Sequence, residues 1–160
     1  MKSFARIAVL FAVVGAVAVP FALAGNGGGR TIELLSVQQR FATVPPVSQQ
    51  APPTVGLRML FQDRAFNRAA QFGKPAGAQI GRAEGVCTLI AVSRKPEAQC
   101  LITAHVPDGQ IVVAGEGDPG AKVTRYAIVG GLGAYANARG WVVGKALSDT
   151  KTVITIHLAS

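Results

Sequence analysis

Apolar and polar residues alternate along most of the chain after residue 30, and short turn signals interrupt the alternation. A period of two is typical of strands that bury one face. The pattern predicts eight strands, at residues 31–41, 55–66, 78–92, 99–106, 110–116, 123–129, 139–147 and 151–158. Between the first two strands, residues 43–54 carry four prolines, which cannot donate hydrogen bonds to a sheet, so we expect an exposed loop there.

Eight short strands without a convincing helix predict an all-β fold. An even number of strands with short connections favours a closed eight-stranded antiparallel barrel, because closure removes the exposed edges. A barrel of this size is wide enough to hold one small ligand. The alternative is an immunoglobulin-like sandwich, whose paired cysteines are usually far apart in sequence.

Cys87 and Cys100 lie thirteen positions apart, in two strands joined by a short turn. In an exported chain such a pair predicts one disulfide, here within a hairpin. The alternative is a pair of free or redox-active thiols, although the spacing is not Cys-x-x-Cys.

The N-terminus resembles a secretory leader. Lys2 and Arg6 precede an apolar run from Ile7 to Leu23, and Ala22-Leu23-Ala24 is typical of a cleavage site. We therefore expect a signal peptide at 1–24, a glycine-rich tail at 25–30 and one domain at 31–160, secreted to the extracellular space without stable membrane insertion after cleavage. The alternative is a membrane anchor, but 17 apolar residues are at the short limit for spanning.

The formal net charge is +8, and +6 once Lys2 and Arg6 are removed. The basic residues are scattered and do not alternate with aromatic residues, so we expect no nucleic-acid partner. The charge favours solubility or loose attraction to anionic polymers.

Three sequence motifs resemble those of the dirigent proteins, whose barrel is shared with allene oxide cyclases. Residues 130–140, GGLGAYANARG, are similar to the signature GGTG-x-[FY]-x-x-ARG. Residues 80–85, IGRAEG, are similar to VGRAQG, and residues 61–63, FQD, resemble FDD. The motifs occur in the family's order, and the resemblance implies the same barrel for residues 31–160.

The resemblance also implies a function and an assembly. Dirigent proteins and allene oxide cyclases steer a bound molecule without a cofactor, and family members are commonly trimers with apolar outer strands. The chain departs from the family in having Leu132 for threonine, Gln62 for the first of two aspartates, and no acid or histidine in residues 36–39. These departures favour the barrel over the radical-coupling reaction.

Asp63 follows Leu57, Met59 and Phe61 at period two, so it shares their face of the strand. A carboxylate among apolar groups has a raised pKa unless it is paired, and it is a candidate catalytic acid or base. The alternative is a solvated or salt-bridged position at the strand end. In either case we expect an arginine partner, Arg82 or Arg139.

The candidate ligand-binding residues are Arg139, Tyr135, Phe61 and Tyr126. Arg139 would bind a carboxylate or phenolate at the barrel mouth, or else tie the glycine-rich stretch to backbone carbonyls or to Asp63. The aromatic rings would stack on a flat ligand, or else pack in the core.

The sequence predicts no cofactor and no metal, because His105 and His157 lack a cluster of further ligands. The leading hypothesis is an exported barrel that binds a small apolar or phenolic molecule in its lumen and steers its cyclisation or coupling. The alternative is a non-enzymatic binding or structural module of the cell envelope. Whether the chain is an enzyme is left open between them, and a homotrimer is expected from the resemblance.

Overall fold

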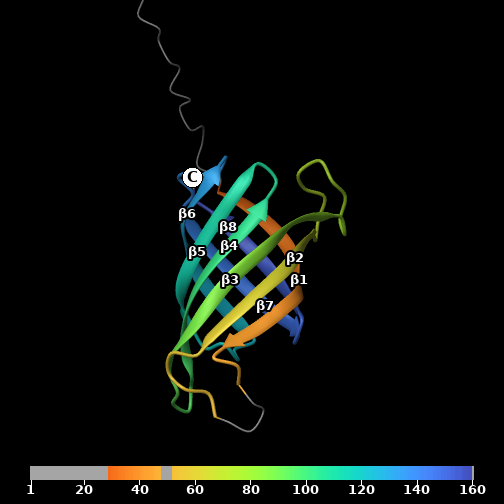
Figure 1. The fold of residues 1–160 in the computed structure, drawn as a ribbon. Coiled ribbons are helices and arrows are strands. Elements are labelled where there is room, and N and C mark those ends of the chain that lie inside the picture. Colours follow the sequence, from red (N-terminus) through yellow and green to blue (C-terminus); the bar gives the residue numbers. More distant parts are fainter. Residues whose placement is uncertain (1–28, 48–51, 160) are drawn as a thin grey trace, which may run out of the picture.

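A computed structural model describes residues 29–47 and 52–159 as a single ring of eight strands (Figure 1). The predicted signal peptide lies outside the described residues, as does most of the predicted tail. The strands are β1 (Arg30–Val44), β2 (Arg58–Asn67), β3 (Gln79–Ala91), β4 (Glu97–Val106), β5 (Gly109–Gly117), β6 (Val123–Gly133), β7 (Gly140–Ser148) and β8 (Lys151–Leu158). Among the described residues, no helix is long and apolar enough to cross a membrane.

Each strand pairs antiparallel with the next one along the chain, and β8 returns to pair with β1. The sheet is therefore a closed barrel, and the predicted fold class is confirmed. Every predicted strand is present, with its ends displaced by up to four residues. The sandwich alternative is wrong, because one continuous sheet contains all eight strands.

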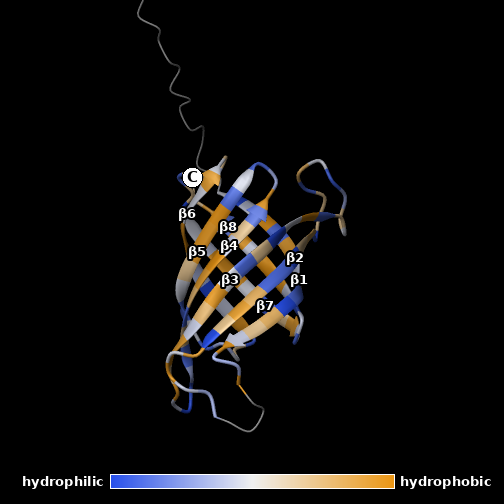
Figure 2. Ribbon diagram, viewed as in Figure 1, coloured by the Kyte–Doolittle hydropathy of each residue, from blue (hydrophilic) through white to orange (hydrophobic). Residues whose placement is uncertain are grey.

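Apolar and polar residues interchange along the front strands (Figure 2), as expected where side chains point alternately to the lumen and to the outer surface. At one end of the barrel the inward side chains form a packed core, in which Ile32, Ile111 and Ile156 are fully buried. Burying each of these side chains stabilises the fold by roughly 2–3 kcal/mol relative to exposure. This end, where β6 ends and β7 begins, is called the closed end below.

The glycine-rich stretch divides between a strand and a turn. Gly130, Gly131 and Gly133 belong to β6, so the prediction that the strand stops at residue 129 is wrong. Gly131 has no room for a side chain, since a Cβ there would lie 2.6 Å from the carbonyl oxygen of Tyr135 and 2.9 Å from its Cβ. Gly133 has a φ of 65°, in the left-handed region. These glycines let residues 134–139 fold tightly over the closed end.

Cys87 and Cys100 form a disulfide between directly paired positions of β3 and β4, as predicted. Their side chains point into the lumen in the half of the barrel away from the closed end. A bridge closing a loop of this length contributes about 3 kcal/mol of stability, mainly by restricting the unfolded chain.

The loop between β1 and β2 folds back over β3 at the other end of the barrel. Leu57 and Leu89 pack together with Ala98 in a small second cluster. The amide of Leu89 donates to the carbonyl of Leu57 at 2.8 Å, and the amide of Gly56 donates to the carbonyl of Leu89 at 2.8 Å. Residues 45–47 and 52–56 are exposed, as the prolines predicted.

Gly131→Ala will destabilise the barrel by about 1–3 kcal/mol, because the methyl group must displace backbone on two sides. Gly117→Ala is the matched control, since a Cβ there would make ordinary contacts at 3.7 and 3.9 Å with the ring of Tyr126. Denaturant unfolding of both variants measures the difference. Equal stabilities would contradict the close packing at Gly131.

Candidate functional site

The lumen contains a cavity of about 310 Å³ between the closed end and the loops at the opposite end. This volume is at the low end of the range for small-molecule sites. The cavity reaches the surface beside Phe41 and Pro119, which are exposed. All eight strands contribute to its wall, which consists of Leu34, Ser36, Gln38, Phe41, Met59, Phe61, Asp63, Ala65, Ala83, Cys87, Cys100, Ile102, Ala104, Ile111, Val113, Pro119, Thr124, Tyr126, Val142, Gly144, Thr152, Ile154 and Ile156.

Asp63 lies in the middle of β2, on the wall of this cavity, and not at a strand end. The hydroxyl of Ser36, on β1, donates a hydrogen bond of 2.7 Å to its Oδ2. Its Oδ1 is buried and has no hydrogen-bond partner among the described residues. Burial raises the pKa of the Asp63 carboxyl above its usual range, and the Ser36 hydrogen bond opposes part of that rise.

The expectation of an arginine partner for Asp63 is wrong. Arg82 lies on the outer face of β3, where its Nε is 3.7 Å from Oε2 of Glu84. The period of two explains this, because Asp63 is paired with Ala83 and both point inward, so Arg82 points outward. Arg139 donates instead to the backbone carbonyls of Ala138 at 2.9 Å and Val129 at 3.5 Å.

Two of the predicted ligand-binding residues, Phe61 and Tyr126, line the cavity. Each ring lies against a glycine of a neighbouring strand. A Cβ on Gly85 would be 2.8 Å from Phe61 Cζ, and one on Gly115 would be 2.9 Å from Tyr126 Cδ1. The small residues therefore make room for the rings within the wall. The Tyr126 hydroxyl donates to Cys100 Sγ at 3.5 Å, and burial raises the pKa of Tyr126.

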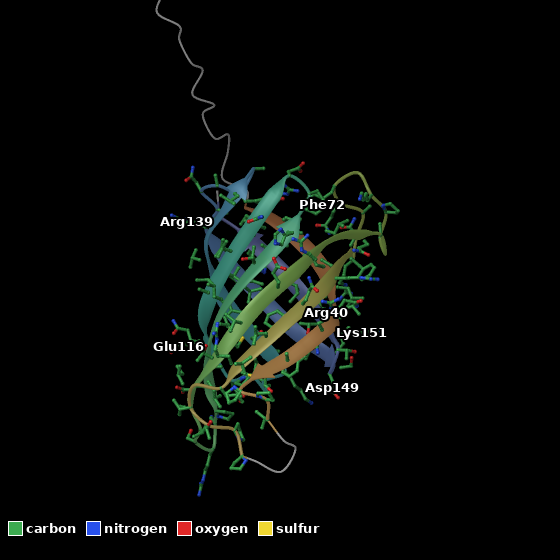
Figure 3. The ribbon with its side chains drawn as sticks, in the orientation of Figure 1. Arg40, Phe72, Glu116, Arg139, Asp149 and Lys151 are labelled. Carbon is green, nitrogen blue, oxygen red and sulfur yellow. A yellow bond between two sulfur atoms is a disulfide. The ribbon has the colours of Figure 1, made fainter. Side chains whose placement is uncertain are left out.

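The other two, Tyr135 and Arg139, lie at the closed end and outside the cavity wall. Tyr135 is 3% exposed within the main core, and its hydroxyl donates to the carbonyl of Pro107 at 3.4 Å. Arg139 is exposed on the outside of the same end (Figure 3). Tyr135 therefore packs in the core, and Arg139 ties the glycine-rich stretch to backbone carbonyls, as the structural alternatives for these two residues stated.

Four polar residues of the wall were not among the predicted site residues: Ser36, Gln38, Thr124 and Thr152. Ser36 and Gln38 on β1 and Thr152 on β8 adjoin Asp63 or one another, because Gln38 pairs with Asp63 and Ser36 pairs with Thr152. The alternation along residues 31–38 does place Ser36 and Gln38 on the face of Leu34. The sequence therefore indicated that both side chains point inward. Their place beside Asp63 and Thr152 follows only from the pairing of β1 with β2 and β8.

The described residues contain no group of three or more His, Cys, Asp or Glu side chains that could hold a metal ion. His105 faces outward on β4, where its Nε2 is 2.9 Å from Oε1 of Glu84. His157 stacks on Trp141, with ring centroids 4.9 Å apart.

Several solved structures share this fold. A pyocyanin demethylase has a TM-score of 0.66 at 24% identity, over 81% of this chain and 99% of that one. AbnU, an exo-specific intermolecular Diels-Alderase, has a TM-score of 0.68 at 18% identity, over 85% of this chain and 100% of that one. The pterocarpan synthase dirigent protein GePTS1 has a TM-score of 0.59 at 17% identity, over 84% of this chain and 88% of that one.

No model of a known protein family matches the sequence, and no curated protein matches it either. The class of this protein is therefore assigned from its fold and not from a match between sequences. The chain has the dirigent-like barrel fold, and the resemblance stated from its motifs is confirmed at the level of the fold.

Asp63→Asn will raise the thermal unfolding midpoint at pH 7. Because the fold raises the pKa of this carboxyl, the ionised form destabilises the folded state at pH values above the raised pKa. That cost disappears as the pH falls toward the ordinary value of 3.8, so the difference between wild type and variant should shrink there. Thermal melts between pH 7 and pH 3 measure it.

Asp149→Asn, in the exposed turn between β7 and β8, is the control for the loss of one negative charge. A wild-type protein that is more stable than Asp63→Asn at pH 7 would contradict the description of Asp63 as a desolvated carboxyl.

Proposed function

We propose that this protein is an exported barrel that binds one small, largely apolar or phenolic molecule in its lumen and steers its cyclisation or coupling. The observation that carries the proposal is the carboxyl group of Asp63 on the wall of a mainly apolar cavity, where one of its oxygens has no partner among the residues that the structure describes. Export is supported by the predicted leader and by the disulfide, which is typical of oxidising compartments.

The lumen would act first by restricting conformation. A flexible molecule held between Phe61, Tyr126 and the isoleucines of the wall has fewer conformers than in water, and the entropy cost of bringing its reacting atoms together falls accordingly. A cyclisation within the bound molecule needs no resident cofactor. The same fold in a Diels-Alderase and in a pterocarpan synthase dirigent protein supports this class of reaction.

Asp63 would act as the acid or base. A raised pKa brings the carboxyl closer to neutral pH, where it can both give and take a proton. Ser36 fixes one carboxyl oxygen, which orients the group on the wall. In its acid form Asp63 would donate to an oxygen of the bound molecule, and in its ionised form it would accept a proton from a hydroxyl.

Ala104→Phe will weaken binding of the neutral dye N-phenyl-1-naphthylamine by at least about tenfold, because Ala104 lines the cavity and the new ring fills it. Dye fluorescence at increasing concentration measures the affinity. Ala42→Phe on β1 is the matched control, since Ala42 is exposed and pairs with Leu60 on the outer face.

Equal affinity in the two alanine variants would place the dye outside the lumen and contradict the proposal. Lost dye binding in Ala42→Phe alone would favour the alternative function, a binding module that uses its outer surface.

The outer face supports the expected self-assembly. Val86, Leu101, Ala114, Ala127 and Trp141 are paired in register from β3 to β7 and form an uncharged row. Leu101 is 52% exposed and Trp141 46% exposed, although both are large and apolar. A homotrimer would cover this row.

Light scattering of residues 25–160 will give the mass of a trimer, and Leu101→Lys will reduce it to that of a monomer, because a charge in an apolar contact is costly. Arg125→Lys on the outer face of β6 serves as a control that preserves charge. A wild-type monomer at micromolar concentration would contradict the assembly.

A further inference from the structure

The charges of the lumen suggest which molecules it accepts, and this inference rests on the proposed function. Asp63 is the single acidic residue in the described cavity wall, and that wall contains no lysine, arginine or histidine. Tyr126 is its other titratable side chain, and burial raises the pKa of Tyr126, which keeps the hydroxyl neutral. The described wall therefore has one side chain that carries a negative charge when it is ionised, and none that carries a positive charge.

The basic residues nearest to Asp63 in the sheet point away from the lumen. Arg64 follows Asp63 on β2 and pairs with Arg82, whose side chain lies against Glu84 on the outer face. The bulge between Gln38 and Arg40 on β1 leaves Arg40 paired with Gln62, also on the outer face and exposed (Figure 3). No guanidinium in this part of the sheet can neutralise an anion inside the barrel.

The hydrogen bonds of Asp63 are incomplete. A carboxylate can accept about four hydrogen bonds, and Ser36 supplies one. The pairing of β8, β1 and β2 places Thr152, Ser36, Gln38 and Asp63 in one polar stripe along the wall. The wall contributed by β4 and β5 is apolar, with Ile102, Ile111 and Val113. A ligand with a polar head and an apolar body would place its head on the stripe.

We infer that the lumen selects apolar molecules whose polar head is a hydrogen-bond donor, best a protonated amine, and rejects the corresponding carboxylates. A donor completes the hydrogen bonds of Asp63, and a cation also pairs with its charge. A carboxylate on the ligand would instead lose its hydration and lie beside the negative charge of Asp63. Both effects weaken binding, because no cation of the described wall compensates for them.

Three two-ring probes of one shape test this selectivity at pH 7: 2-naphthylmethylamine, 2-naphthylmethanol and 2-naphthoate. Titration calorimetry or protein-observed NMR gives their affinities. We expect the amine to bind at least about tenfold more tightly than the carboxylate, with the alcohol between them. In Asp63→Asn, the amine should fall to the affinity of the alcohol and the carboxylate should gain.

Glu84→Gln is the matched control, because it removes a carboxylate from the outer face and should leave the ranking unchanged. Asp63→Ser is a second variant that removes the same charge, and the wild-type ranking tests the inference without either variant.

The outcomes separate the two proposals. If the alcohol binds but the carboxylate binds as tightly as the amine or more tightly, the selectivity is overturned while lumen binding stands. If none of the three probes binds, the proposed function fails and the selectivity with it. An amine preference that survives Asp63→Asn would assign the selectivity to other groups and overturn the role of Asp63.

Discussion

The pairing of β1 with β8 is the constraint on which the rest of the structure depends. Eight residues of β1, from Arg30 to Val37, pair with β8 and close the sheet on itself. Closure satisfies the backbone groups that two edge strands would expose. It also forces every second side chain into one interior, whose width is set by the number of strands. Whether that interior is a core or a cavity then depends on the size of the inward side chains.

Side-chain size changes along the barrel axis. At the closed end, isoleucines and the ring of Tyr135 fill the interior, and the glycines of β6 let the covering turn approach closely. Beside this core, small residues such as Ala83, Ala104 and Gly144 line the wall and leave space. The disulfide contributes stability in this less densely filled half, where packing alone supplies less. One sheet therefore combines a stabilising core with a cavity.

The period of two and the turn residues allowed the eight strands, the barrel and the disulfide to be predicted, because these depend on local pattern. The same period correctly placed Asp63 beside Phe61. It could not reveal the bulge on β1 between Gln38 and Arg40, which shifts the inward set so that Phe41 lines the cavity. It also could not show which end of the barrel is filled. For that reason Arg139 and Tyr135 were predicted in a site from which the core separates them.

The division of the barrel into two halves separates the residues that make the fold from those available for chemistry. The glycine-rich stretch that most resembles dirigent proteins lies at the closed end, and its glycines act through backbone approach. Asp63 does not stabilise the fold in this way. Burial raises the pKa of its carboxyl, so the ionised form opposes folding at neutral pH. The resemblance to dirigent proteins therefore accounts for the shape of the barrel, while the residues of the open half give its cavity a chemistry of its own.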